Sequence, residues 1–450
     1  MKSAKVFAMC FALAISAVAA VAAGAQTQAQ AQPEVSEKQD IAVFALGYYG
    51  WDIPGQALGS IDTEVQKVFV DLGRFNVFGV EQRLSSGGLN QFIATLREVK
   101  SQTMTLPDKF IFGEAFLTQA EFNSLAGAFV VAVPVVTWFQ TVYNTKTLQW
   151  ETDITTSVTM IDVAEGGQIL AIKSLKTSGS DKNDYMKSVR SAISGIPFQL
   201  EYEIRTIPQF QIKTRVLSVS GDGIRFQLGQ DMGIRKGDEF ALMGTENIGG
   251  ILEERESGLV VVREVGQSSS FGQILYSETE PGMNTALREI PRQGVDMDLF
   301  LHVVSGNDGA VLPGLRMALS RGYYGLRPYV AVQVPLQQIF SAFTVTILPV
   351  NVILGGEYNL LFGRFGLTPY AGLGFTYIHL SEAISGITTD TDFLSHVGGQ
   401  AQVKLSYLFN RNMRAFVDIG YEYWAAVSAI PGLFEDINGT SVGAGILFKL

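Results

Sequence analysis

Apolar and polar residues alternate with a period of two through the last third of the chain, Val295–Leu450, in eight runs that continue to the final residue. In one of these runs Val403 and Leu405 are apolar, whereas Lys404 and Ser406 are polar. Successive side chains of a β-strand point to opposite faces of the sheet. The pattern therefore predicts an antiparallel sheet with one apolar face and one polar, partly charged face.

The gaps between these runs alternate between short and long. Short turns on one side and longer loops on the other are typical of outer-membrane β-barrels, which direct the apolar face to lipid. An even number of strands also places both ends of the barrel on one side. We therefore predict a closed eight-stranded transmembrane barrel at 295–450, with a soluble eight-stranded barrel or sandwich as the alternative. The predicted short turns are Arg321–Gly325, Phe362–Gly366 and Asn410–Asn412, and the predicted long loops are Ser305–Pro313, Gln337–Ala342, Leu380–Asp392 and Ala426–Asp436.

The N-terminus has the pattern of a secretory signal. Two lysines precede an apolar stretch, Val6–Ala22, and the small residues that follow favour cleavage after Ala25. We predict a signal peptide at 1–25 and a linker at 26–40. The only cysteine, Cys10, lies inside the signal. Disulfides, thiol catalysis and cysteine metal sites are therefore excluded from the mature chain.

Charge and hydropathy argue against two further classes of protein, nucleic-acid binders and proteins with transmembrane helices. The net charge of −10 argues against a nucleic-acid partner. After the signal there is no stretch of about 20 apolar residues, so we expect no transmembrane helix.

Residues 41–206 predict an α/β domain, because strand-like runs alternate with apolar residues at helical spacing. Thr118 and Glu121 have the spacing of a capping box, with Leu117 placed as its hydrophobic staple. The expected elements are strands at Ile41–Tyr49 and Phe75–Glu81, helices around Ile61–Leu72 and Leu89–Val99, a short helix after Thr118, a hairpin of Phe129–Tyr143 and Thr152–Val163, a strand at Gln168–Lys176, and a last helix capped by Ser180 or Asp181.

Residues 207–291 predict a small β-barrel of short strands separated by glycine turns. Phe210–Ser220 and Gly223–Leu228 should form a hairpin, followed by strands at Gly258–Val265 and Phe271–Leu275. The fold class is therefore multidomain: an α/β domain, a small all-β domain and a C-terminal eight-stranded antiparallel barrel.

Several segments resemble known envelope proteins. The opening IAVF, the later RFNVFGVEQRL and the pair TTSVTMIDVAEGGQIL resemble the domain shared by curli-secretion (CsgG-like) proteins and the middle part of flagellar assembly protein T, and GIRKGDEF resembles the C-terminal domain of that flagellar protein. The C-terminal runs resemble OmpA/OmpW-like barrels, although the usual terminal Phe is Leu450. The resemblance implies a protein or peptidoglycan partner in the cell envelope. It does not imply a pore-forming ring, because the lipidated cysteine of curli-secretion proteins is missing.

No catalytic, cofactor-binding or metal-binding residue is predicted. His302, His379 and His396 form no HExxH motif or close pair, and we expect them to have structural roles. Thr388–Asp392 is interpreted as a solvated loop, with Ca²⁺ binding as the alternative. Glycines inside the predicted strands, such as Gly443, should relieve crowding in a narrow lumen and are not phosphate loops. Asp162 and Asp238 are interpreted as turn residues.

The lumen of the predicted barrel is where polar residues should converge. An eight-stranded barrel has just enough interior for side chains, so we expect mixed charges to pair there, with a narrow solute or proton path as the alternative. The residues predicted to face inward are Asp296, Asp298, Arg316, Arg327, Glu357, Lys404, Asp418, Glu422 and Lys449.

The sequence thus predicts a non-enzymatic protein of the cell outer membrane. Its barrel would anchor periplasmic domains that bind an envelope partner or assist an assembly or secretion machine. One alternative is a surface adhesin or small-solute channel that acts through the barrel. Another is a soluble periplasmic enzyme.

Overall fold

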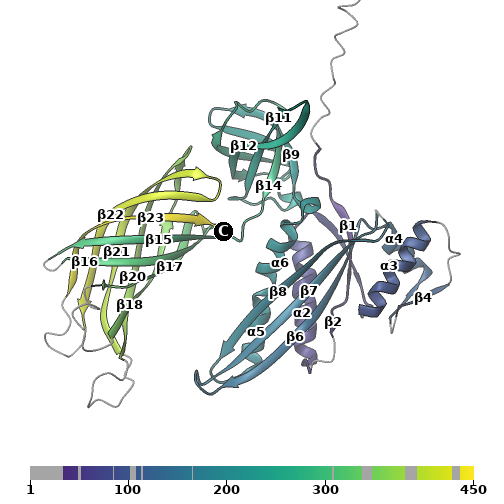
Figure 1. Ribbon diagram of the computed structural model, residues 1–450, viewed down its shortest axis with the longest axis horizontal. Helices are drawn as coiled ribbons and strands as arrows, with labels where there is room; N and C mark the ends of the chain where they lie inside the picture. Colours follow the sequence, from purple (N-terminus) through teal and green to yellow (C-terminus); the bar gives the residue numbers. More distant parts are fainter. Residues whose placement is uncertain are drawn as a thin grey trace, which may run out of the picture.

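The computed structural model describes residues 34–48, 52–84, 86–101, 108–112, 115–164, 166–306, 309–336, 347–380, 393–427 and 436–450. The predicted signal peptide and most of the long barrel loops, including Thr388–Asp392, lie outside these residues. The chain forms three units in order: a mixed α/β unit, a small six-stranded barrel and a C-terminal eight-stranded antiparallel barrel (Figure 1). The predicted fold class is confirmed. Among the described helices, none has the length and apolar character needed to cross a membrane.

The α/β unit is a sheet with helices on both faces. Its main strands follow the order β3-β1-β6-β7-β8. The elements are β1 (Gln39–Phe44), β2 (Gly47–Tyr48), α2 (Gly55–Asp71), β3 (Phe75–Val80), α3 (Ser86–Lys100), β4 (Lys109–Phe112), β5 (Ala115–Thr118), α4 (Gln119–Gly127), β6 (Val130–Asn144), β7 (Gln149–Asp162), β8 (Gln168–Asp181), α5 (Tyr185–Ser194) and α6 (Ile196–Arg205).

Alternating residues of the central strands belong to two different cores. Ile41 and Val43 of β1 pack with residues of α2, α5 and α6. Ala42 and Phe44 pack with residues of α3, α4 and the β4–β5 hairpin. The period-two orientation of strand side chains therefore separates two helical layers.

Most elements of the α/β unit follow the sequence predictions. The capping box is confirmed: Thr118 Oγ1 accepts a hydrogen bond from the Glu121 backbone N–H at 3.2 Å, and the Thr118 N–H donates to Glu121 Oε2 at 2.7 Å. The predicted cap of the last helix is wrong. Neither Ser180 nor Asp181 caps α5, because β8 continues to Asp181 and Asp184 accepts the hydrogen bonds of the first helical turn. Helix α6 and the β4–β5 hairpin were not predicted.

The small barrel closes in the strand order β10-β13-β12-β11-β14-β9. The hairpin around Gly221 is confirmed by the antiparallel pairing of β9 with β10. The barrel encloses an apolar core that includes Phe226, Phe240 and Val260. Its elements are η1 (Pro208–Phe210), β9 (Lys213–Ser220), β10 (Gly223–Gln227), η2 (Gln230–Met232), β11 (Glu239–Ile248), β12 (Ile251–Val265), β13 (Ser269–Ser277) and β14 (Ala286–Ile290).

The α/β unit and the small barrel touch backbone to backbone at two glycines. Gly73 follows α2, Gly233 follows η2, and both have positive φ angles, +70° and +74°. A Cβ atom on Gly233 would lie 1.9 Å from the Leu72 carbonyl oxygen, and one on Gly73 would lie 2.7 Å from the Gly233 nitrogen. Only glycine fits both the conformation and the space.

The C-terminal barrel closes through eight strands. Each strand pairs with the next, β15 pairs with β23, and β18 pairs directly with β20. The short β19 also pairs with β20. The strands are β15 (Val295–Ser305), β16 (Ala310–Leu319), β17 (Leu326–Gln333), β18 (Ile347–Tyr358), β19 (Leu360–Phe362), β20 (Phe365–Leu380), β21 (Phe393–Asn410), β22 (Met413–Ala426) and β23 (Ile437–Lys449).

The three predicted short turns are confirmed, but the predicted long loop Ser305–Pro313 is wrong. Strand β16 begins at Ala310, because it stays in register with β15 through the pairs Val303–Val311 and Leu301–Pro313. The connection between these two strands is therefore short.

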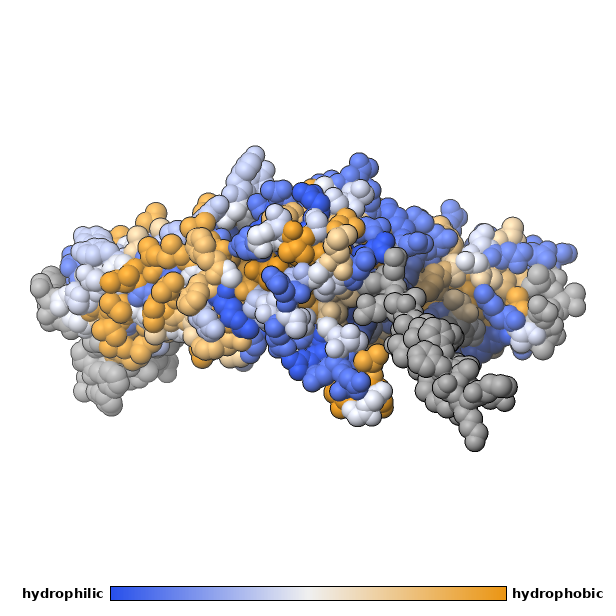
Figure 2. Space-filling model, turned by 90° about the horizontal axis from the view of Figure 1, so that it is seen from above, coloured by the Kyte–Doolittle hydropathy of each residue, from blue (hydrophilic) through white to orange (hydrophobic). Residues whose placement is uncertain are grey.

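The polarity of this barrel is inverted relative to a soluble one. Ile419 and Leu405 point outward and are 58% and 50% exposed, whereas Asp418 and Lys404 beside them are buried. Apolar residues gather over the C-terminal barrel, and hydrophilic residues cover much of the remaining visible surface (Figure 2). The predicted assignment of apolar residues to the outer face and polar residues to the lumen is confirmed.

Candidate functional site: buried charges in the barrel and at its mouth

One cluster of charges fills the part of the lumen near the short turns. Asp298 accepts hydrogen bonds from Arg316 Nε at 2.8 Å and from Lys404 Nζ at 2.9 Å. Glu357 lies 3.3 Å from Arg327 and 3.7 Å from Lys404, and Arg327 also pairs with Asp296. Asp298 and its five neighbours in this cluster are all buried: Asp296, Arg316, Arg327, Glu357 and Lys404. Opposite charges held this closely compensate for each other's lost hydration.

A second cluster surrounds His302. Its Nδ1 lies 2.7 Å from Glu422 Oε1, and its Nε2 lies 3.4 Å from Asp418 Oδ2. The Tyr370 hydroxyl donates to Asp418 at 2.8 Å. A Cβ atom on Gly443 would lie 2.2 Å from Asp418 Oδ1, so this glycine makes room for the cluster as predicted.

Of the other two histidines, the structure describes the side chain of His396 alone. His396 is buried and lies 2.9 Å from the Ser395 hydroxyl. His379 belongs to β20, and its side chain is outside the described residues. Among the part of the chain that the structure describes, no group of three or more His, Cys, Asp or Glu residues has the arrangement of a metal site.

Large side chains fill the lumen within and beside the two clusters. Trp424, Arg316 and Lys404 are among the largest fully buried side chains of the protein. The Arg316 guanidinium lies 4.1 Å from the centre of the Tyr370 ring, which is the geometry of a cation–π contact. The lumen is a packed polar core at this level, consistent with the small interior of an eight-stranded barrel.

The small barrel sits against the short-turn end of the C-terminal barrel and contacts all three short turns. Arg321 pairs with Asp238, and Arg411 pairs with Glu256. The Arg364 guanidinium stacks 4.0 Å from the centre of the Tyr276 ring. The mouth of the C-terminal barrel is thus held through each of its turns.

Apolar contacts support the same junction. Leu408 of β21 is fully buried in a cluster with Leu259, Val261 and Leu275 of the small barrel. Leu361 packs against this cluster, and its carbonyl oxygen accepts a hydrogen bond from the Gln273 side chain at 3.0 Å. The two barrels therefore share a small core.

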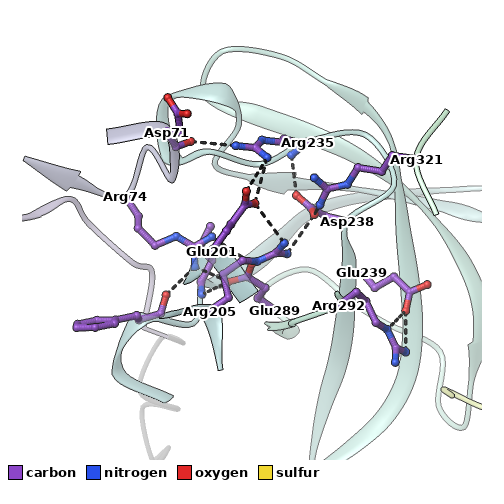
Figure 3. A network of polar contacts seen from close by, with 12 residues as sticks. Asp71, Arg74, Glu201, Arg205, Arg235, Asp238, Glu239, Glu289, Arg292 and Arg321 are labelled. Carbon is purple, nitrogen blue, oxygen red and sulfur yellow. Dashed lines mark hydrogen bonds and ion pairs between the residues drawn. The ribbon is translucent and has the colours of Figure 1, made fainter. Parts of the chain in front are cut away.

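Glu289 of β14 is the centre of a charge network that joins the α/β unit to the small barrel (Figure 3). It accepts hydrogen bonds from Arg74 at 2.7 and 3.1 Å, from Arg205 Nε at 2.7 Å and from the Ile212 N–H at 3.0 Å. Burial raises the pKa of Glu289, but the charges of Arg74 and Arg205 outweigh that effect and hold its pKa at about 2.

The network continues from Arg205 towards the C-terminal barrel. Arg205 Nη2 donates to Asp238 at 3.1 Å, and Asp238 also pairs with Arg321. Arg235 bonds to Glu201 at 3.0 Å and to the Asp71 carbonyl oxygen at 3.1 Å (Figure 3). One chain of buried or partly buried ion pairs thus runs through all three units.

Two residues differ from their sequence interpretation. Asp238 does accept a turn hydrogen bond from the Arg235 N–H, at 2.7 Å, but it is buried and also links two arginines from different units. Lys449 does not join the lumen clusters, because it pairs with Glu239 of the small barrel. The other residues predicted to face inward are buried in the barrel. No sequence pattern marked Glu289 as part of a charge network, because its partners Arg205 and Arg74 are 84 and 215 positions away in the chain.

No protein-family model and no curated protein matches this chain. Several solved structures share limited similarity with it, and three of them follow. Neisserial surface protein A (NspA) is 14% identical with a TM-score of 0.25, and the match covers 35% of this chain and 96% of that protein. The N-terminal β-barrel domain of Pseudomonas aeruginosa OprF is 16% identical with a TM-score of 0.22, covering 35% and 96%. Lipoprotein GNA1162 from Neisseria meningitidis is 15% identical with a TM-score of 0.21, covering 36% and 97%.

Proposed function

We propose that this chain is a non-enzymatic outer-membrane protein whose C-terminal barrel anchors the α/β unit and the small barrel on the periplasmic side. The inverted polarity of the closed eight-stranded barrel supports this proposal most directly. A band of outward apolar side chains costs free energy in water but is stabilised in lipid, and strands of a closed barrel leave no backbone group unpaired in the bilayer.

The packed lumen bears on the alternatives. Arg316, Lys404 and Trp424 block the described interior with paired or apolar contacts, which disfavours a solute channel. The adhesin alternative depends on the long loops, most of whose residues are not described.

The first prediction concerns location and orientation. Full-length protein should remain with the membrane fraction after a high-salt wash and migrate heat-dependently on a gel. Because the predicted signal cleavage would remove Cys10, Ser305→Cys at the loop end of β15 should be the only thiol and should react with an impermeant maleimide on intact cells. Tyr323→Cys, 82% exposed at the short-turn end, should react only in opened cells. Protein that is soluble without detergent would contradict the membrane assignment, and the reverse labelling would contradict the orientation.

We further propose that the periplasmic part binds an envelope protein or peptidoglycan. Strand β8 supports this proposal, because it is the last strand of its sheet and pairs only with β7 among the described strands. A long unpaired edge can accept a strand from another chain. Ile169 and Ile172 on β8 are 50% and 61% exposed, which adds apolar contact for a partner.

The second prediction tests this edge. A photo-crosslinking residue at Ile172 should capture an envelope component in intact cells. The matched control is the same residue at Ile251, which is 67% exposed at a hairpin end of the small barrel and should capture nothing specific. Capture only from a probe in the predicted loop Leu380–Asp392 would favour the adhesin alternative.

A further inference from the structure

A cavity of about 210 Å³ lies between the small barrel and the mouth of the C-terminal barrel. Its walls come from the ends of strands in both barrels and from the turn at Arg321. Cations outnumber acids in these walls, although the whole chain carries a net charge of −10. The cationic side chains that matter here are Arg263, Arg292, Arg321, Arg327, Arg414 and Lys449.

The acids in the walls are already paired. Asp238 has Arg205 and Arg321 as partners. Glu239 pairs with Arg292 at 2.9 Å and with Lys449. Burial raises the pKa of Glu239, but these two cations outweigh that effect and lower it. Asp296 pairs with Arg327.

Arg414 of β22 has no acid in direct contact. It is only 4% exposed, yet within the described ranges it forms no ion pair. Its hydrogen bonds are long and go to neutral groups: 3.4 Å to the Arg364 carbonyl oxygen and 3.5 Å to the Ser406 hydroxyl. A buried guanidinium with such partners has lost much of its hydration and regains little through direct hydrogen bonds.

Arg263 of β12 is a second cation of the cavity that has no direct ion-pair partner. Its Nε and Nη2 donate to the neutral Gln273 Oε1 at 3.0 and 2.7 Å, and it forms no ion pair with any residue that the structure describes. Burial lowers its pKa. The acids Glu239 and Asp296 and the cations Arg327 and Arg263 all lie close enough to Arg414 to interact with its charge. The cavity therefore contains two cations that form no direct ion pair with a described residue, although Asp222 acts on the charge of Arg263 from a distance.

We propose that this cavity binds a phosphate group, with Arg414 and Arg263 as its principal ligands. Inorganic phosphate carries a charge of about −1.5 to −2 near neutral pH, and a phosphodiester headgroup carries a single negative charge. Either group can accept two parallel hydrogen bonds from the fork of a guanidinium that has no direct ion-pair partner. The group could be free phosphate or the headgroup of a phospholipid at the inner leaflet, which would lie beside this mouth. This site is separate from the proposed anchoring function. Phosphate binding does not require a bilayer and should therefore also occur in detergent.

The third prediction is a thermal-shift and calorimetric titration of full-length protein in zwitterionic, phosphate-free detergent. Sodium phosphate should raise the unfolding temperature, since a ligand of the folded state stabilises it. Sodium chloride at equal ionic strength and sodium acetate should not. Arg414→Gln and Arg263→Gln should each weaken phosphate binding by at least about tenfold. Arg414→Gln should also leave the phosphate-free protein at least as stable as the wild type, because it removes a buried charge that has no direct ion-pair partner. The control is Arg255→Gln, whose side chain is exposed and pairs with Glu246 and Glu278.

A parallel titration with micelles doped with phosphatidylglycerol separates the two sources. Binding of free phosphate supports a soluble anion, and binding of the doped micelles alone supports a lipid headgroup. The proposal is overturned if neither is bound, if acetate is bound as tightly as phosphate, or if both arginine variants bind phosphate like the wild type.

Discussion

Ile419→Arg is expected to abolish assembly of the C-terminal barrel into membranes. Ile419 pairs across the sheet with Val403 and Val442, and all three side chains point outward and are exposed. An arginine on the lipid face costs about 2–4 kcal/mol near the bilayer midplane. That cost is a large share of the stability of an ordinary domain, which is about 5–15 kcal/mol.

The measurement is the fraction of full-length protein that is membrane-bound and heat-modifiable. Leu252→Arg serves as the matched control, because Leu252 is 66% exposed on the small barrel and lies outside the proposed bilayer. It should assemble like the wild type. If Ile419→Arg is tolerated equally well, the outward face does not contact lipid.

Glu289→Gln is expected to separate the α/β unit from the small barrel. The substitution leaves Arg74 and Arg205 buried without their shared carboxylate. Removing one partner of a buried ion pair costs about 3–5 kcal/mol. Limited proteolysis of the full chain should then cut between the two units, and calorimetry should show a lower unfolding temperature for them.

Glu246→Gln is the control for this substitution. Glu246 pairs with Arg255 on the surface of the same small barrel, with both side chains about half exposed, and such pairs contribute about 0–1 kcal/mol. Equal stability of the two variants would show that the buried network does not hold the units together.

The lowered pKa of Glu289 predicts that the stability of the protein depends on pH. The pKa of Glu289 is lowered from 4.5 to about 2, so its stabilisation is fully present above pH 4.5 and is lost as the pH falls towards 2. A shift of this size corresponds to about 3 kcal/mol. The slope of stability against pH in this window should be shallower in Glu289→Gln than in the wild type. Identical slopes would contradict the depressed pKa.

The local pattern of the sequence determined the eight strands of the C-terminal barrel and the side on which each residue lies. Period-two alternation is a property of each strand alone, so the outward position of Ile419 and the inward position of Asp418 follow without knowledge of the neighbouring strands. The capping box at Thr118 is equally local, because both of its hydrogen bonds join residues three positions apart.

Local patterns failed where the competing interactions were distant. The cap of α5 moved to Asp184 because β7 pairs with β8 as far as Asp181, which extends the strand beyond its apolar residues. The connection after Ser305 is short because pairing with β15 continues past the last strongly alternating residues. In both cases ladder hydrogen bonds to another strand decided the boundary.

Only the tertiary structure decided which charges meet. Asp238 reads as a turn residue in the sequence and becomes a link between Arg205 and Arg321, 33 positions before it and 83 after it. Lys449 lies in register with the lumen residues but pairs with Glu239 instead, because the small barrel covers the mouth of the C-terminal barrel. Hydrophobic periodicity records which face of an element is buried, whereas an ion pair depends on how separate units dock, and that geometry leaves no periodic trace in the chain.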